Sequence, residues 1–186
     1  PVASCNDVDF QNLMDVYMDA VFYPNIYKNP KIFMQEGWHY ELESRDSELK
    51  YNGVVFNEMK GAFSSADDVL TRHTFINLFP DNNYRNESGG DPEVIPDLTY
   101  EDFLQYHKEY YHPVNSFIYG DFDINEKLDY LSNEYLNDFE RDDVNIDSSI
   151  KLQKGFDSPK DVEEFYAISD DESEDNNTYL SYNVVV

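Results

Sequence analysis

Residues 52–65 read NGVVFNEMKGAFSS, in which a glycine precedes a run of mainly apolar residues. Its apolar side chains recur at helical spacing after Gly53, at Val54, Val55, Met59, Ala62 and Phe63. This spacing fits a helix better than a strand, although two β-branched residues begin it. Ser65 then precedes Asp68 by three residues, as in a variant capping box, and predicts a second helix that stops at Pro80.

Helical spacing marks three further segments. The expected helices cover residues 6–21, 99–110 and 123–139. Asn6 or Asp7 is placed to cap the first of them, and Thr99 is placed to cap the second.

Strands are expected where apolar and polar residues alternate or where short apolar runs occur. Alternation predicts a half-buried strand at residues 38–43, and the run at 117–119 predicts a short buried strand. Two more strands are expected at 163–168 and 178–186, joined by a solvated acidic connection over 170–175. Glycines and prolines in the segment between the helices, residues 81–97, predict a long loop.

Helices and strands mix without a regular βαβ alternation, which favours an α+β fold with an antiparallel sheet covered by helices. We expect a single domain over residues 1–186. Its helix and strand core would span 1–139, a connector 140–162, and two further strands of the same sheet 163–186.

Composition restricts the classes of partner. The chain has 186 residues, of which 40% are apolar, enough to bury the core of one domain. Thirteen Lys and Arg residues against thirty-nine Asp and Glu give a net charge of -26, which repels nucleic acid and anionic membrane surfaces. We therefore expect neither partner. The charge is most simply a solubility device, although it would also favour cationic peptides.

Other features concern the compartment and the extent of the chain. Cys5 cannot form an internal disulfide, and no apolar run approaches the length that spans a bilayer. We expect a soluble protein and favour the cytoplasm. The chain opens on Pro1 without an initiating Met and stops at Val186 inside an apolar strand pattern, so we expect a fragment.

Residue patterns alone identify no catalytic centre. None of the histidines at 39, 73, 107 and 112 belongs to a zinc signature, and a surface or half-buried role is the simpler reading of each. His107 and His112 would lie roughly 140° apart around a helix. The chain has no phosphate-binding glycine loop and no Gly-x-Ser-x-Gly nucleophile motif.

Several blocks nevertheless occur in the order found in one family. They are the stretch 52–65, the preceding block 35–43, the Ser-Gly-Gly-Asp-Pro block with its continuation to 100, and 110–121. Together they resemble the presequence-protease branch of the insulinase-type, or inverzincin, zinc metallopeptidases. The resemblance covers nearly the whole chain and implies part of the N-terminal catalytic domain, with a LuxS/mitochondrial-processing-peptidase-like fold.

The resemblance also implies a metal ligand. In that family, two histidines of an H-x-x-E-H helix and a glutamate on a later helix hold Zn²⁺, and Glu58 matches the later glutamate. Such a site leaves one open position for a water whose pKa the metal lowers. The H-x-x-E-H motif is absent here, so the resemblance places the general base and two histidine ligands upstream of Pro1. Without the family, Glu58 would be an exposed helical glutamate.

The resulting expectation is a fragment of a zinc endopeptidase that hydrolyses peptides and unstructured segments. The fragment alone would bind zinc weakly or not at all and would be inactive. Its partners would be the remainder of the parent chain and, in the parent, peptide substrates. Two alternatives stay open: a non-catalytic structural half of such a peptidase, and an acidic binding module for cationic peptides.

Overall fold

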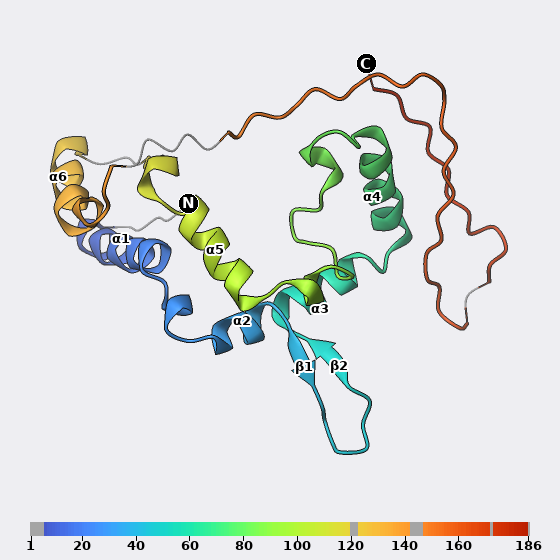
Figure 1. Cartoon of the computed structure of the whole chain (residues 1–186), viewed down its shortest axis with the longest axis horizontal. Coiled ribbons are helices and arrows are strands. Elements are labelled where there is room, and N and C mark those ends of the chain that lie inside the picture. The colour runs from blue at the N-terminus through green and yellow to red at the C-terminus, as the bar shows by residue number, and fades with distance from the viewer. Residues whose placement is uncertain (1–5, 120–122, 142–146, 172, 186) are drawn as a thin grey trace. The chain divides into compact units, whose positions relative to one another are not determined.

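The computed structural model describes residues 6–119, 123–141, 147–171 and 173–185 (Figure 1). They form two compact units. Unit 1 combines the segment up to residue 33 with 99–147, and unit 2 combines 34–98 with 148–186. The α2 helix (Lys31–Glu36) spans the residue at which the first segment passes into unit 2.

Unit 1 is helical. Its elements are α1 (Asp7–Phe22), η1 (Asn25–Tyr27), α5 (Tyr100–Tyr110), η4 (Pro113–Asn115), α6 (Ile124–Glu134) and η5 (Leu136–Asp138). The helices predicted at 6–21 and 99–110 are confirmed with their caps, whereas the one predicted at 123–139 ends as an α-helix at Glu134 and is followed by η5. The Asn6 side chain accepts the backbone N–H of Asp9 at 2.9 Å, and Thr99 forms a reciprocal capping box with Asp102.

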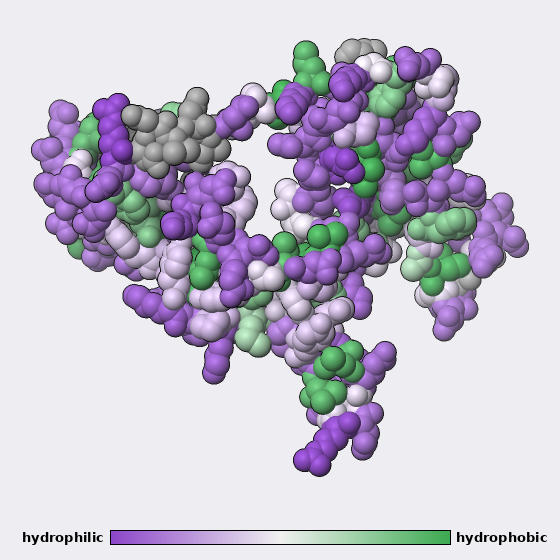
Figure 2. Space-filling model, viewed as in Figure 1, coloured by the Kyte–Doolittle hydropathy of each residue, from purple (hydrophilic) through white to green (hydrophobic). Residues whose placement is uncertain are grey.

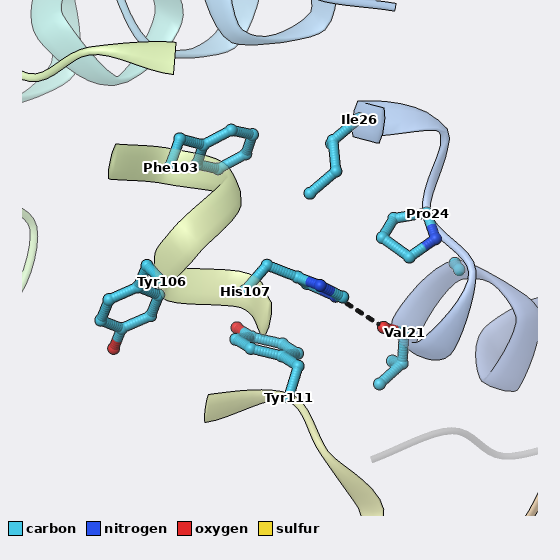
Figure 3. Close-up of a pocket in the computed structure, with 8 residues that line it drawn as sticks. Val21, Pro24, Ile26, Phe103, Tyr106, His107 and Tyr111 are labelled. Carbon is cyan, nitrogen blue, oxygen red and sulfur yellow. Dashed lines mark hydrogen bonds between the residues drawn. The ribbon is translucent and has the colours of Figure 1, made fainter. Parts of the chain in front are cut away.

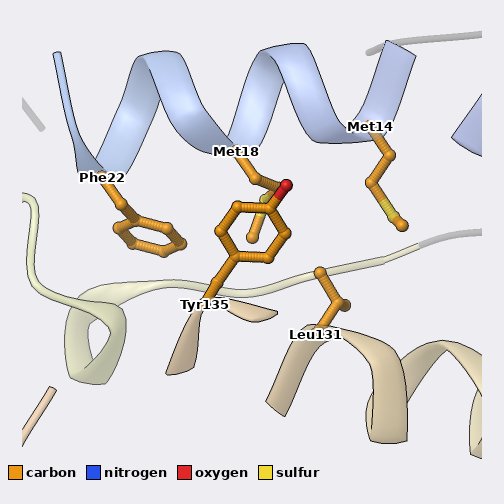
Figure 4. Close-up of a cluster of buried hydrophobic side chains, with 5 residues drawn as sticks. All are labelled: Met14, Met18, Phe22, Leu131 and Tyr135. Carbon is orange, nitrogen blue, oxygen red and sulfur yellow. The ribbon is translucent and has the colours of Figure 1, made fainter. Parts of the chain in front are cut away.

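The core of unit 1 lies between α1 and α6. Its buried side chains are Met14, Met18, Phe22, Leu131 and Tyr135, drawn together in Figure 4. Leu131 of α6 is only 1% exposed. Leu13 and Tyr17, which share the helical spacing of the α1 residues, stay exposed in this chain.

A polar network beside this core also joins α1 to α6. The Asp15 carboxylate accepts the hydroxyl groups of Tyr130 at 2.7 Å and Tyr135 at 3.0 Å, and the Gln11 amide at 3.2 Å. Burial, and then the bond to Asp15, raises the pKa of Tyr135 above its ordinary value. The network thus keeps both phenols protonated and bound to the carboxylate.

Unit 2 contains the only sheet found within the described residues. Strands β1 (His39–Glu41) and β2 (Lys50–Asn52) pair antiparallel, with His39 opposite Asn52 and Glu41 opposite Lys50. The helical elements that follow are α3 (Val54–Ala62), α4 (Ala66–Leu78), η2 (Asn83–Arg85) and η3 (Ile95–Asp97). The strand predicted at 38–43 is confirmed at its centre, whereas β2 was not predicted.

Aromatic side chains hold the hairpin together. Tyr40 and Tyr51 face each other across the strands with ring centroids 5.3 Å apart, and Trp38 packs edge-on against Tyr51 at 5.7 Å. The Trp38 indole N–H donates to the carbonyl of Leu98 at 2.8 Å. The base of the hairpin is therefore tied to the end of the loop that the sequence predicted over 81–97.

Two groups of predicted strands are corrected. Residues 117–119 are not a strand, and Phe117 and Tyr119 are 103% and 97% exposed, because no described strand lies beside them to supply backbone partners. The segments 163–168 and 178–185 are extended but form no ladder in the described residues. The Tyr166 hydroxyl donates to the carbonyl of Asn177, and the Tyr166 and Tyr179 rings pack edge-on with centroids 5.7 Å apart, so the two segments touch through side chains.

The α+β class is confirmed, with the sheet limited to β1 and β2 in the part of the chain that the structure describes. The single domain over 1–186, with its core at 1–139, its connector at 140–162 and a C-terminal part at 163–186, stays a prediction. Hydrophilic side chains cover most of the face shown in Figure 2, in keeping with the charge of -26. Among the described helices, none combines the length and apolar character needed to cross a bilayer.

Replacement of Asp15 tests the polar network. Asp15→Ala leaves the hydroxyl groups of Tyr130 and Tyr135 without their acceptor, which should cost about 1–3 kcal/mol of stability. Asp15→Asn keeps one acceptor oxygen and should lose less. Thermal unfolding followed by circular dichroism measures both, with about 2–4 °C expected per kcal/mol. Equal midpoints for Asp15→Ala and the unsubstituted chain would contradict the network's role.

Tyrosine ionisation should weaken unit 1 at high pH. Burial, followed by the hydrogen bond to Asp138, raises the pKa of Tyr23 from 10.0 to about 12. Because the folded-state pKa is the higher one, this stability is present below pH 10 and is lost as pH rises toward 12. Tyrosinate absorbance and helical circular dichroism, followed together, should change in that window. Tyr23→Phe should reduce the stability lost there; an unchanged loss would refute the assignment.

Candidate functional site

Glu58, the predicted metal ligand, lies in the second turn of α3 and is exposed. No hydrogen bond or ion pair of its carboxylate is found within the described residues. Its helix is short, but contacts that do not involve Glu58 fix it at both ends. The carboxylate therefore belongs to a helix that is fixed at both ends, and it remains available to bind a ligand.

The beginning of α3 depends on a close backbone approach. Gly53 precedes the helix with φ 155° and ψ 154°, and the N–H of Phe56 in the first turn donates to the carbonyl of Gly37 at 3.3 Å. A Cβ atom at position 53 would lie 2.2 Å from the Gly37 oxygen. Only glycine fits there, since neither the backbone angle nor the space admits a side chain.

A side-chain amide reinforces the same junction. Asn52, the last residue of β2, accepts the N–H of Gly53 at 2.8 Å and the side-chain amide of Asn57 at 2.7 Å, both at Oδ1. Phe56 is buried and packs against the Tyr51 ring at 5.8 Å. The first turn of α3 is thus attached to the end of β2 through Asn52 and to the turn before β1 through Gly37.

The far end of α3 is braced through Arg72 of α4. The Arg72 guanidinium lies 4.8 Å from the ring centroid of Phe63, and it forms an ion pair with Asp91. Side chains of Arg72 and Asp91 are only 17% and 25% exposed, so this pair is partly shielded from water. The guanidinium joins α3, α4 and the loop that carries Asp91.

A cavity of about 370 Å³ lies beside this brace. Its walls come from α3, α4 and the loop 83–88, and include Met59, Phe63, Thr71, Arg72, Tyr84 and Asn86. Met59 follows Glu58 in the sequence, but Glu58 itself is not part of the lining.

The four histidines are all half-buried, as the sequence suggested, and each is engaged elsewhere. His39 donates from Nδ1 to the carbonyl of Met34, and His73 lies 3.3 Å from the Glu164 carboxylate. His112 accepts the N–H of Val114 at Nδ1. None of them joins Glu58.

His107 lines a second cavity, of about 310 Å³, formed within unit 1 by η1, α5 and the end of α1 (Figure 3). Its Nε2 donates to the carbonyl of Val21 at 2.8 Å, and its Nδ1 lies 2.8 Å from the Tyr27 hydroxyl. Its ring stacks on Tyr111 with centroids 4.7 Å apart. Both ring nitrogens are occupied, so His107 joins helices and offers no lone pair to a metal.

The donor set decides what the chain can do with a metal. A carboxylate such as that of Glu58 is a donor that Zn²⁺ accepts, and it is accessible here. Structural and catalytic zinc sites use three or four protein ligands. Over the described ranges, no group of three His, Cys, Asp or Glu side chains is placed to hold a metal ion, and Cys5 lies outside those ranges. The residues fit one ligand of a zinc site and not a whole site.

Comparison with known proteins gives the class. Residues 97–186 match the Peptidase M16 inactive domain. The whole chain is 54% identical over 188 aligned positions to Protein HypA of Clostridium perfringens. The chain belongs to the insulinase-type, or M16, peptidase family.

Within this family, the similarity extends to presequence proteases. The chain is 49% identical over 168 positions to presequence protease 1 of Arabidopsis thaliana, covering 89% of the chain, and 46% identical over 143 positions to the mitochondrial presequence protease of Drosophila melanogaster, covering 74%. The predicted family and branch are confirmed. The chain spans 19% of the length of the Clostridium protein and 16% and 14% of the other two.

The contacts that hold α3 were not predicted from the sequence. Gly37 and Gly53 were visible as glycines flanking a strand and a helix, but their approach requires β2, which the alternation did not indicate. The Arg72 to Asp91 pair joins residues 19 positions apart, across a helix end and a loop. A conventional pattern search has no signal for such a pair.

The junction at Gly53 can be tested by stability. Gly53→Ala should destabilise the chain by about 1–3 kcal/mol from backbone strain alone, with the clash against Gly37 in addition. Gly61→Ala, on the same helix with no atom near the added Cβ, should stabilise it by about 0.5–1 kcal/mol. Urea unfolding of the two variants measures the difference. Equal effects of the two substitutions would exclude the junction as the cause.

Proposed function

We propose that this chain is the part of a zinc endopeptidase that supplies Glu58 as a metal ligand. The observation that carries the proposal is the placement of an exposed carboxylate, free of ion pairs in the described residues, on a helix braced at both ends. The remaining ligands would be two histidines of an H-x-x-E-H helix outside this chain. When bound, zinc would lower the pKa of the water that attacks the peptide bond.

The proposed substrates are peptides and unstructured protein segments. The names of the plant and insect relatives support this class, since both are called presequence proteases. With a single ligand, the chain alone would hold zinc weakly or not at all and would be inactive. We propose a cytoplasmic location, as favoured by the sequence, whereas the plant and fly relatives are named as organellar proteins.

The second candidate is a non-catalytic structural half of an M16 peptidase. The observation that favours it is the match of residues 97–186 to the domain described as inactive. The polypeptide upstream of Pro1 separates the two candidates. An intact H-x-x-E-H motif there supports the enzyme, and a motif without its histidines supports the structural half.

Glu58→Gln in the full-length polypeptide tests the metal ligand. The substitution preserves size and removes the charge, so stoichiometric zinc should be lost, with peptide hydrolysis reduced by more than the roughly 100-fold seen for residues outside the ligand shell. Glu101→Gln, another exposed helical glutamate, is the matched control and should keep both. Zinc is measured by atomic emission and hydrolysis with a fluorogenic peptide. Full zinc and activity in Glu58→Gln would sink the assignment.

A further inference from the structure

We propose that Asn52 is a positioning residue for Glu58, acting through the first turns of α3. The inference rests on the proposed function and adds to it the part of the chain that orients the ligand. It concerns the side-chain amide of Asn52 and its two hydrogen bonds, described above. Neither bond involves the Glu58 carboxylate itself.

Asn52 occupies a fixed place in the hairpin. It pairs with His39 in the β1–β2 register, at the inner end of the two strands. Trp38, next to His39, is tied by its indole N–H to the Leu98 carbonyl. The position of Asn52 is therefore set by backbone pairing and by the aromatic contacts of the hairpin, independently of α3.

No side chain caps the start of the helix. Gly53 stands at the N-cap position and has no side chain to accept an N–H of the first turn. The Asn52 oxygen, one residue earlier, accepts instead from the Gly53 backbone and from the side chain of Asn57. One atom thus binds both the residue that precedes the helix and the residue that precedes Glu58.

This arrangement limits how α3 can rotate against the hairpin. The Phe56 N–H to Gly37 bond restrains the helix from the turn that precedes β1, and the Asn57 to Asn52 bond restrains it from the end of β2. Two restraints on adjacent residues oppose a rotation that either alone would permit. Metal ligands tolerate errors of only about 0.5 Å, so a carboxylate on an unrestrained turn would bind less tightly.

The experiment uses the full-length polypeptide and three substitutions. Asn52→Ala removes the acceptor, Asn52→Asp keeps an oxygen for both donors, and Asn57→Ala removes only the second bond and leaves the Gly53 turn intact. Zinc affinity is measured by competition with a chelator, and ligand geometry by the visible spectrum of the cobalt-substituted protein. Glu58→Gln is included in the same series.

We expect Asn52→Ala and Asn57→Ala to weaken zinc binding by about 10-fold or more and to alter the cobalt spectrum. Asn52→Asp should restore both, and the double substitution Asn52→Ala with Asn57→Ala should be no worse than the stronger single one. If Asn52→Ala fails to fold, Asn57→Ala carries the test.

Wild-type zinc affinity and cobalt spectrum in Asn57→Ala would overturn the proposal, as would equal losses in Asn52→Ala and Asn52→Asp. The Glu58→Gln arm separates this failure from that of the proposed function. If Glu58→Gln loses zinc while Asn57→Ala does not, only the positioning role is wrong. If Glu58→Gln retains full zinc, the ligand assignment and the positioning role fail together.

Discussion

The contact between the backbones of Gly37 and Gly53 is the constraint on which unit 2 depends. At this contact the turn before β1 lies against the residue before α3. Only Gly53 separates the end of β2 from the start of α3, so the hairpin closes where the helix begins. Aromatic packing, the Asn52 amide and the helix that carries Glu58 all follow from this approach. Any larger residue would force the two segments apart and separate the helix from the sheet.

Local signals predicted the helices well, because caps and apolar spacing act within a few residues. Asn6, Ser65, Thr99 and Asp123 each accept the N–H three residues later. Strands were predicted poorly. The expected run at 117–119 is apolar enough, but a strand exists only when a neighbour supplies backbone partners, and sequence patterns do not reveal neighbours.

The same contrast between local signals and contacts across elements applies to the candidate site. Glu58 was found through collinear blocks, which the comparison with presequence proteases supports, and its helix was found through periodicity. The contacts that support this helix were not predicted. The Asn52 amide, the Gly37 carbonyl and the Arg72 guanidinium act across elements, and polar residues in such positions look the same in the sequence as solvated ones. The sequence therefore predicts Glu58 as a candidate ligand but does not reveal the contacts that hold its helix.

The hairpin also has a practical consequence, because its aromatic contacts lie toward one end. The rings of Trp38, Tyr40 and Tyr51 pack near the base. The turn beyond Leu42 holds exposed hydrogen bonds between Ser44 and Ser47, and an exposed pair between Glu43 and Lys50 that contributes little. The tip at 43–48 is consequently a site where an inserted sequence should be tolerated. A fluorophore or an affinity peptide inserted there would report on the protein without disturbing the helix that begins at the other end.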